Sequence, residues 1–163
     1  MIFNLLFGRK ADQAKTLYAA IVAAARQPQF YRDMQVPDTI DGRFYILVLH
    51  LALVIIRLHG ERDKLRQQLV NQFCVDMDDN VRELGAGDLG VSKKVRRMAE
   101  AFQGRYVAYE AAQDLTAMSD AIARNVYAGK APSDALARYA LAAREKLAAQ
   151  ATDDIVVGRP QFK

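Results

Sequence analysis

The feature of this sequence that most restricts its fold is an apolar stretch from Phe44 to Ile56, interrupted only by His50. As a helix, this stretch would be roughly 20 Å long, whereas the hydrocarbon core of a bilayer is about 30 Å thick. It is therefore too short to cross a membrane. We predict a helix that is buried in the core of a folded domain.

The composition agrees with a helical domain. Of the 163 residues, 52% are hydrophobic, four are proline and none is tryptophan. The length suits one domain, and abundant alanine with scarce proline favours helices over strands. We predict an all-α fold: a single compact, bundle-like domain of about six helices over residues 1–163, with its core at about 12–150.

Apolar residues recur with helical spacing along nearly the whole chain. Pro28, Gly60 and a group of glycines at 85, 87 and 90 interrupt the pattern. The expected helices cover about 12–26, 43–59, 61–84, 91–109, 115–126 and 133–150.

The ends of the chain and its cysteine content give weaker indications. Residues 1–10 are apolar and then basic, which is the reverse of the order in a signal peptide. They suit a disordered start, a strand packed on the core or a short interfacial anchor. We expect residues 1–10 and 152–163 to be mobile. Cys74 is the only cysteine, so an intrachain disulfide is excluded and a reducing compartment is indicated.

Two local patterns resemble ligand sites but lack the required context. The segment at 85–90 fits G-x-G-x-x-G, yet a helical segment precedes it where a dinucleotide site needs a strand. It predicts a helix end and a turn, although a phosphate at the start of the next helix stays physically possible. A calcium loop that began at Asp76 would need glycine at its sixth position and glutamate at its twelfth. The chain has Val81 and Gly87 at these positions, so the pattern does not fit. We expect no metal and no cofactor.

Charged residues form two successive groups. The acidic group is Asp76, Asp78, Asp79, Glu83 and Asp88, and the basic group is Lys93, Lys94, Arg96 and Arg97. The basic residues suit an ordinary solvated face, or an anion-binding surface for RNA, lipid headgroups or an acidic protein. The acidic-then-basic order also suits electrostatic docking within the fold or on a partner. The net charge of +4 does not choose among these possibilities.

The apolar stretch carries a narrow polar stripe. Arg43, His50 and Arg57 are seven residues apart and therefore share one face of a helix. A buried arginine is costly unless it is paired, so we predict that Arg43 or Arg57 meets a carboxylate from another segment. The candidate partners are Asp38, Asp41, Asp78, Asp79 and Glu83. The alternative is that the stripe faces water.

No catalytic arrangement emerges from local spacing. His50 and His59 are nine residues apart and do not share a helix face. The sequence contains no nucleophile elbow, no Cys-x-x-Cys and no His-x-x-x-His. We expect no catalytic residue and predict a protein that binds another macromolecule rather than an enzyme.

Several stretches resemble the ubiquinol-cytochrome c chaperone family, the assembly factors of the respiratory cytochrome bc complex (complex III). The similarity covers roughly residues 14–150, and its most specific part is Asp-Asn-x-Arg-Glu-x-Gly-x-Gly-Asp at 79–88. The matching stretches are 25–31, 36–44, 49–51, 57–58, 77–89, 91–95, 98–102, 104–105 and 124–127.

The resemblance implies a mostly helical, non-catalytic chaperone that binds newly made cytochrome b and promotes assembly of the ubiquinol-cytochrome c reductase complex. Mitochondrial members work with a small partner protein near the ribosome exit and the inner membrane. Without a long targeting extension or a membrane anchor, this chain looks like a bacterial member. It would act in the cytoplasm, peripheral to the inner face of the membrane, without binding DNA.

Two other functions stay open at this point. One is an RNA- or ribosome-binding module that uses the basic face of the helix at 91–109. The other is an enzyme or cofactor carrier, which would need a pocket around the Arg43–His50–Arg57 stripe.

A receptor for a new membrane protein needs an apolar groove with charged rims. We predict that the groove is formed by the edge of the helix at 43–59 and three aromatic residues, with the acidic and basic groups as its rims. The candidate client-binding residues are Asp78, Asp79, Asn80, Arg82, Glu83, Asp88, Lys93, Lys94, Phe102, Arg105, Tyr106 and Tyr109.

Overall fold

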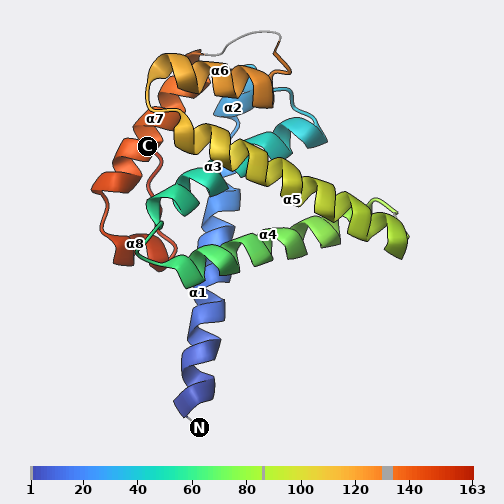
Figure 1. Cartoon of the computed structure of the whole chain (residues 1–163), viewed down its shortest axis with the longest axis vertical. Coiled ribbons are helices and arrows are strands. Elements are labelled where there is room, and N and C mark those ends of the chain that lie inside the picture. Colours follow the sequence, from blue (N-terminus) through green and yellow to red (C-terminus); the bar gives the residue numbers. More distant parts are fainter. Residues whose placement is uncertain (1, 86, 130–133) are drawn as a thin grey trace.

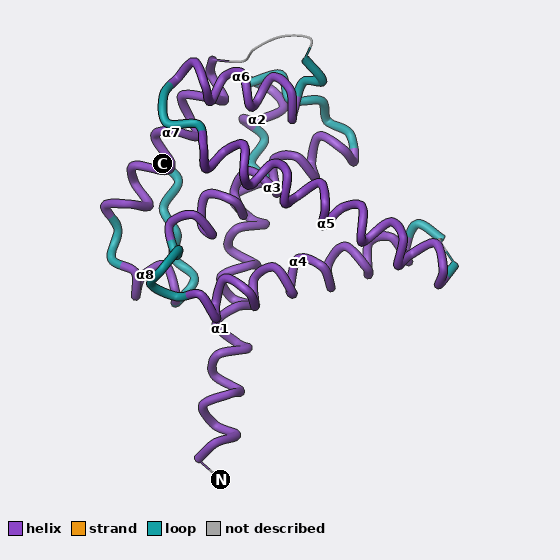
Figure 2. Tube along the Cα trace, in the orientation of Figure 1, coloured by secondary structure: helices purple, strands orange, loops and turns teal. Residues whose placement is uncertain are grey.

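The computed structural model describes the backbone of residues 2–85, 87–129 and 134–163, and the side chains of 13–85, 87, 90–129 and 134–163. This described part contains helices and no strand, and six of its helices are long, as predicted (Figures 1 and 2). The long helices are α1 (Ile2–Ala25), α3 (Ile40–Arg57), α4 (Asp63–Glu83), α5 (Asp88–Ala111), α6 (Leu115–Val126) and α7 (Asp134–Ala149). The short ones are α2 (Gln29–Arg32) and α8 (Thr152–Val156).

Helix α3 is the centre of the domain, as the apolar stretch predicts. All ten residues from Ile46 to Ile55 are buried. A helix that is apolar on every side needs neighbours on every side, and α3 contacts α1, α5, α6 and α7 (Figure 1). Its start is fixed by Thr39, whose side chain accepts a hydrogen bond from the Gly42 amide at 3.1 Å.

His50 is buried in α3, and both of its ring nitrogens have a hydrogen-bond partner. Nδ1 lies 2.8 Å from the Ile46 carbonyl oxygen, which can only accept, so Nδ1 carries the proton. Nε2 therefore accepts from the Tyr139 hydroxyl of α7 at 2.6 Å. The rings of Phe30 and Phe162 pack against the imidazole with centroid distances of 5.1 and 4.8 Å. These contacts make His50 a core residue that joins α3 to α7.

We predicted an ion pair for Arg43 or Arg57, and both arginines form one, in different surroundings. Arg43 is largely exposed and meets Asp38, one of the candidate partners, at 2.8 Å. The Arg57 side chain is only 15% exposed and meets Glu61 at 2.9 Å, a partner that we did not predict. Arg57 also donates to two carbonyl oxygens at the C-terminal end of α7, those of Leu147 and Gln150. The stripe is thus three separate contacts rather than one polar face toward water.

The expectation of a mobile C-terminal tail at 152–163 is wrong. Residues 152–156 form α8, and Ile155, Val156 and Phe162 are buried. The Gln161 amide donates to the Gln150 side chain at 3.0 Å, which holds the tail beside the end of α7. The tail is ordered because Phe162 closes the core over His50.

At the other end, the backbone of α1 is helical from Ile2, so the interpretation of this segment as a strand is wrong. The N-terminal end of α1 extends beyond the other helices (Figure 1). The side chains of residues 1–12 lie outside the described part, and the expected mobility of residues 1–10 stays a prediction. Among the helices described, we find none with the length and apolar character needed to span a membrane.

The packing of the tail predicts a large loss of stability when Phe162 is truncated. Phe162→Ala removes a side chain that is 6% exposed, which costs about 3 kcal/mol of unfolding free energy. Urea denaturation measures this loss. Val157→Ala, at a position that is 49% exposed, is the control and changes stability by less than about 0.5 kcal/mol. Equal midpoints for both variants would contradict the packed tail.

The burial of His50 predicts a specific dependence of stability on pH. Burial lowers its pKa from 6.5 to about 4. Between these two values the unfolded chain binds a proton that the folded chain does not, so the folded state loses stability as the pH falls. We expect a loss of about 3 kcal/mol from this residue between pH 7 and pH 4.

Urea denaturation at several pH values tests this expectation. His50→Gln should remove the part of the pH dependence of the unfolding free energy that His50 contributes, whatever the substitution does to stability at pH 7. His59→Gln, at an exposed position, should leave that pH dependence in place. An unchanged slope in His50→Gln would show that His50 does not titrate as the fold requires.

Candidate functional site

Helices α4 and α5 form a hairpin whose tip projects from the rest of the molecule (Figure 1). The turn contains Gly85, at φ +84°, and Gly87 caps the start of α5. A positive φ suits glycine at the end of a helix. The G-x-G-x-x-G pattern is therefore a turn between two helices, as predicted.

Both helices of the hairpin pack on the body, α4 mainly against α1 and α5 mainly against α3. The apolar residues Leu65, Leu69, Phe73 and Met77 are buried. Near the start of the projecting part, the Tyr18 hydroxyl of α1 donates to Asp76 at 2.7 Å. Burial, together with this hydrogen bond, raises the pKa of Tyr18 well above its ordinary value, so Tyr18 stays a donor. Beyond this point α4 leaves α1, and a space opens between them.

That space is a groove of about 1240 Å³ with two walls. One wall, here called the α1–α3 wall, comprises Val22, Ala25, Arg26, Pro28, Tyr31, Arg32, Asp38, Ile40, Arg43, Phe44 and Leu47. The other, here called the hairpin wall, comprises Asp76, Met77, Asn80, Glu83, Leu84 and Met98.

Each wall exposes a large apolar side chain. Ile40 is 68% exposed on the α1–α3 wall and Leu84 is 65% exposed on the hairpin wall. They are the two most exposed of the large apolar residues in the described part of the chain. Exposed apolar surface inside a concavity indicates a binding site for an apolar partner.

The walls differ in charge. The α1–α3 wall holds Arg26, Arg32 and Arg43; of these, Arg32 is paired with Asp33 and Arg43 with Asp38. The hairpin wall holds Asp76 and Glu83 and no cation. Within the described residues, neither Arg26 nor Glu83 forms an ion pair.

The structure brings only part of the predicted client-binding set to this groove. Asn80 and Glu83 line it, as does the start of α3, the predicted helix edge. Asp79 is exposed on α4, and Asp78 is paired with Arg82 at 2.6 Å; none of these three lines the groove. Lys93 and Lys94 are exposed on α5 and also lie outside the lining. The side chain of Asp88 lies outside the described residues.

Three further predicted residues contact the domain itself: Phe102 and Tyr109 are buried, so their assignment to an exposed client surface is wrong, whereas Arg105 is half-buried and its assignment stays a prediction. Phe102 is 4% exposed and Tyr109 is fully buried, because the apolar face of α5 packs on the core. Arg105 lies 4.6 Å from the centroid of the Tyr45 ring and donates to the Asn125 carbonyl oxygen at 3.2 Å. These residues stabilise the domain.

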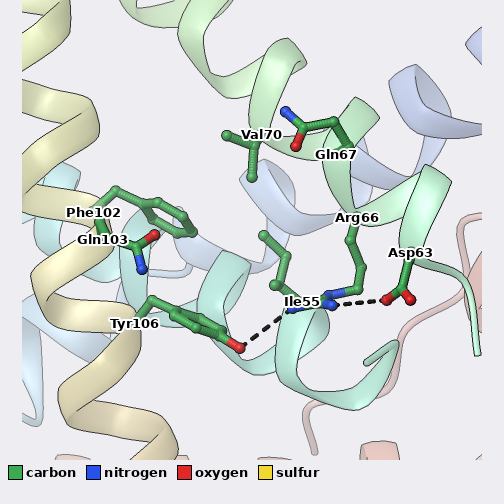
Figure 3. A pocket seen from close by; sticks show the side chains of 8 residues that line it. All are labelled: Ile55, Asp63, Arg66, Gln67, Val70, Phe102, Gln103 and Tyr106. Atoms are coloured by element: carbon green, nitrogen blue, oxygen red, sulfur yellow. Dashed lines mark hydrogen bonds and ion pairs between the residues drawn. The ribbon is translucent and has the colours of Figure 1, made fainter. Parts of the chain in front are cut away.

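Tyr106 lies in a second, smaller cavity of about 310 Å³ between α3, α4 and α5 (Figure 3). Arg66 crosses this cavity and donates to Asp63 at 2.8 Å and to the Tyr106 hydroxyl at 3.3 Å. The same hydroxyl donates to Glu110 at 2.7 Å, so its hydrogen-bonding capacity is largely used within the protein. The two cavities share no lining residue.

Two of the three residues of the stripe lie outside both cavities, and the described side chains contain no cluster of potential metal ligands. Neither cavity is lined by His50 or Arg57, the inner members of the stripe. Among the side chains that the structure describes, no three His, Cys, Asp or Glu residues come together as metal ligands.

Sequence reasoning missed several residues of the groove, among them Arg26, Tyr31, Ile40, Leu84 and Met98. Ile40 and Leu84 carried a usable signal, because both are apolar residues at the ends of helices, next to turn residues. The spacing of apolar residues did not show that these two helix ends face each other.

The α1–α3 wall depends on a tight turn before α3. A Cβ on Gly42 would lie 1.8 Å from the Pro37 carbonyl oxygen, so Gly42→Ala forces the turn to shift. We expect it to lower the unfolding free energy by more than about 2 kcal/mol. Gly104→Ala in α5 is the control: its Cβ meets nothing within 4 Å. That change raises helix propensity and stabilises by about 0.5–1 kcal/mol. The same effect from both substitutions, measured by urea denaturation, would contradict the close approach at Gly42.

Comparison with known proteins relates this fold to a family. The family model described as "Ubiquinol-cytochrome C chaperone" matches residues 32–162. The crystal structure of the Cbp3 homolog from Brucella abortus superposes with a TM-score of 0.83 and 36% sequence identity, covering 97% of this chain and 94% of that one.

A curated relative from Drosophila melanogaster, ubiquinol-cytochrome c reductase complex assembly factor 1, is 24% identical over 102 residues. The match covers 58% of this chain and 39% of the relative, so the chain spans about two fifths of that protein. With the family model matched over most of its length and a solved relative sharing its whole fold, the chain belongs to the ubiquinol-cytochrome c chaperone family.

Proposed function

We propose that this protein is a non-catalytic chaperone that binds newly made cytochrome b in the groove and promotes assembly of the ubiquinol-cytochrome c reductase complex. Membership of the family supports a role in the assembly of complex III. The proposal assigns the client to the groove and places the protein, when it acts, beside the membrane into which cytochrome b inserts.

The observation that carries the proposal is the exposure of Ile40 and Leu84 on opposite walls of one concavity. Each of these side chains contacts water instead of the core, which costs about 1.5–3 kcal/mol relative to burial. A client helix lying between them would bury both.

The family-like stretches support the same location. The segments 25–31, 36–44 and 77–89 are among the stretches of the sequence that resemble the family. In the structure, each contributes residues to the groove, although they are far apart in the chain.

The chemistry of the client also suits this site. A newly made membrane protein exposes apolar helices before they are buried in lipid or against one another. A groove with an apolar floor and charged walls shields such a helix by hydrophobic contact alone, without a covalent step.

A second function is favoured by one observation. Lys93, Lys94 and Arg97 are exposed on α5 and form no ion pair within the described residues. This basic surface suits RNA or the ribosome, and steep salt dependence of RNA binding is its signature. It lies outside the groove lining, so the two functions are separable by mutation.

The proposal is tested by deleting the gene in its host and restoring it with variants. Ile40→Asp with Leu84→Asp should fail to restore cytochrome b and complex III, because two lost apolar contacts weaken client binding by more than about tenfold. The matched control is Val107→Asp with Val157→Asp, at positions 52% and 49% exposed that do not line the groove.

Haem b absorbance and reductase activity give the readout, with the unfolding midpoints of all variants as a check on the fold. Full restoration by the groove variant would contradict the proposed site. Normal cytochrome b in the deletion strain, together with salt-sensitive RNA binding that Lys93→Glu and Lys94→Glu abolish, would favour the second function.

A further inference from the structure

The shape of the groove restricts the conformation of its occupant. Its walls are built mainly from helices, and the described part of the chain has no strand edge to offer. An extended segment would therefore leave its own backbone amides and carbonyls unpaired in an apolar site, whereas a helix satisfies them internally. A helix of about ten residues is roughly 15 Å long and 10 Å wide, or about 1200 Å³. The groove volume of about 1240 Å³ is of the same order, so the groove has room for one such helix.

The floor provides the apolar contacts for this helix. The floor comprises the buried and half-buried apolar residues of the two walls: Val22, Phe44 and Leu47 on the α1–α3 wall, and Met77 and Met98 on the hairpin wall. Side chains project from a helix on all sides. When the apolar face of a helix lies on this floor, one flank of the helix therefore points toward each wall.

The walls present opposite charges to those flanks. Arg26 on the α1–α3 wall and Glu83 on the hairpin wall are exposed, and within the described residues both are free of ion pairs. The other charged side chains of the lining have partners within the protein: Arg32 is paired with Asp33 and Arg43 with Asp38, and Asp76 accepts a hydrogen bond from Tyr18. Arg26 and Glu83 are thus the charges most available to a partner.

We propose that Arg26 and Glu83 set the direction in which a client helix lies in the groove. This inference rests on the proposed function and names its partner chemistry: one amphipathic helix with an apolar face, an acidic flank and a basic flank. The acidic flank faces Arg26 and the basic flank faces Glu83. Rotation of the helix by 180° within the groove exchanges the flanks, so only one direction matches both walls. Charge complementarity of this kind fixes register more than it adds affinity.

Synthetic peptides test the proposal on the full-length protein. Three helices of about 15–20 residues share one apolar face and differ in their flanks: split (one acidic, one basic), all-acidic and all-basic. At physiological salt we expect the split peptide to bind about fivefold more tightly than the other two, as measured by fluorescence anisotropy. Arg26→Glu should shift relative affinity toward the all-basic peptide, and Glu83→Lys toward the all-acidic one. Arg138→Glu and Glu145→Lys, exposed charges of α7 outside the groove lining, are the controls.

Direction is read from a photo-crosslinker at the N-terminus of the split peptide and of a version with its flanks exchanged. Both should bind within about twofold of each other, since each can satisfy both walls. Their cross-links should map to opposite ends of the groove. Cross-links at the same end, or equal affinities of all three peptide types with no response to Arg26→Glu and Glu83→Lys, would overturn the proposal.

The same peptides separate this inference from the proposed function. Suppose that all three peptides bind the wild-type protein equally and that Ile40→Asp with Leu84→Asp abolishes this binding. The groove would then remain the client site, and only the directing role of the charges would be rejected. Failure of every peptide to bind the wild-type protein would contradict the groove as a helix receptor and the proposed function with it.

Discussion

The rest of the structure depends on the complete burial of α3. Ten consecutive residues with no side toward water oblige other helices to surround them, and α1, α5, α6 and α7 do so. The one polar group in this stretch, His50, is tolerated because Ile46 and Tyr139 satisfy both of its ring nitrogens. The C-terminal tail then completes the enclosure with Phe162.

The groove follows from where this enclosure ends. The first turn of α3 extends past the buried stretch, so Arg43 and Phe44, together with Leu47 at the edge of that stretch, line the space beside the hairpin. The hairpin itself is fastened to α1 at Tyr18 and Asp76, and its tip continues beyond that attachment. A rigid core thus holds two walls apart, and the apolar residues at their rims lack an internal partner. An exposed apolar surface of this kind is what a receptor needs to cover apolar side chains of another protein transiently.

Much of the fold could be predicted from the sequence, because the spacing of apolar residues indicates helices locally and glycine often marks their ends. The six long helices and the glycine turn at 85–87 are examples. The errors arose where an outcome depended on residues distant in sequence. Phe102 and Tyr109 share the apolar face of α5, and sequence alone did not distinguish a core face from a groove. Phe162 looked like part of a loose tail because its partner, His50, is more than a hundred residues away. The groove was missed in part for the same reason: its walls come from segments that meet only in the folded protein.

We propose that the groove, and not the basic face of α5, contacts the client. This proposal is tested most directly by placing a photo-crosslinking amino acid at position 40, 84 or 107 of the protein in its host and irradiating cells during synthesis of cytochrome b. We expect cross-links to newly made cytochrome b from positions 40 and 84 and none from position 107, which is exposed on α5 outside the groove lining. Cross-links from position 107 alone would contradict it.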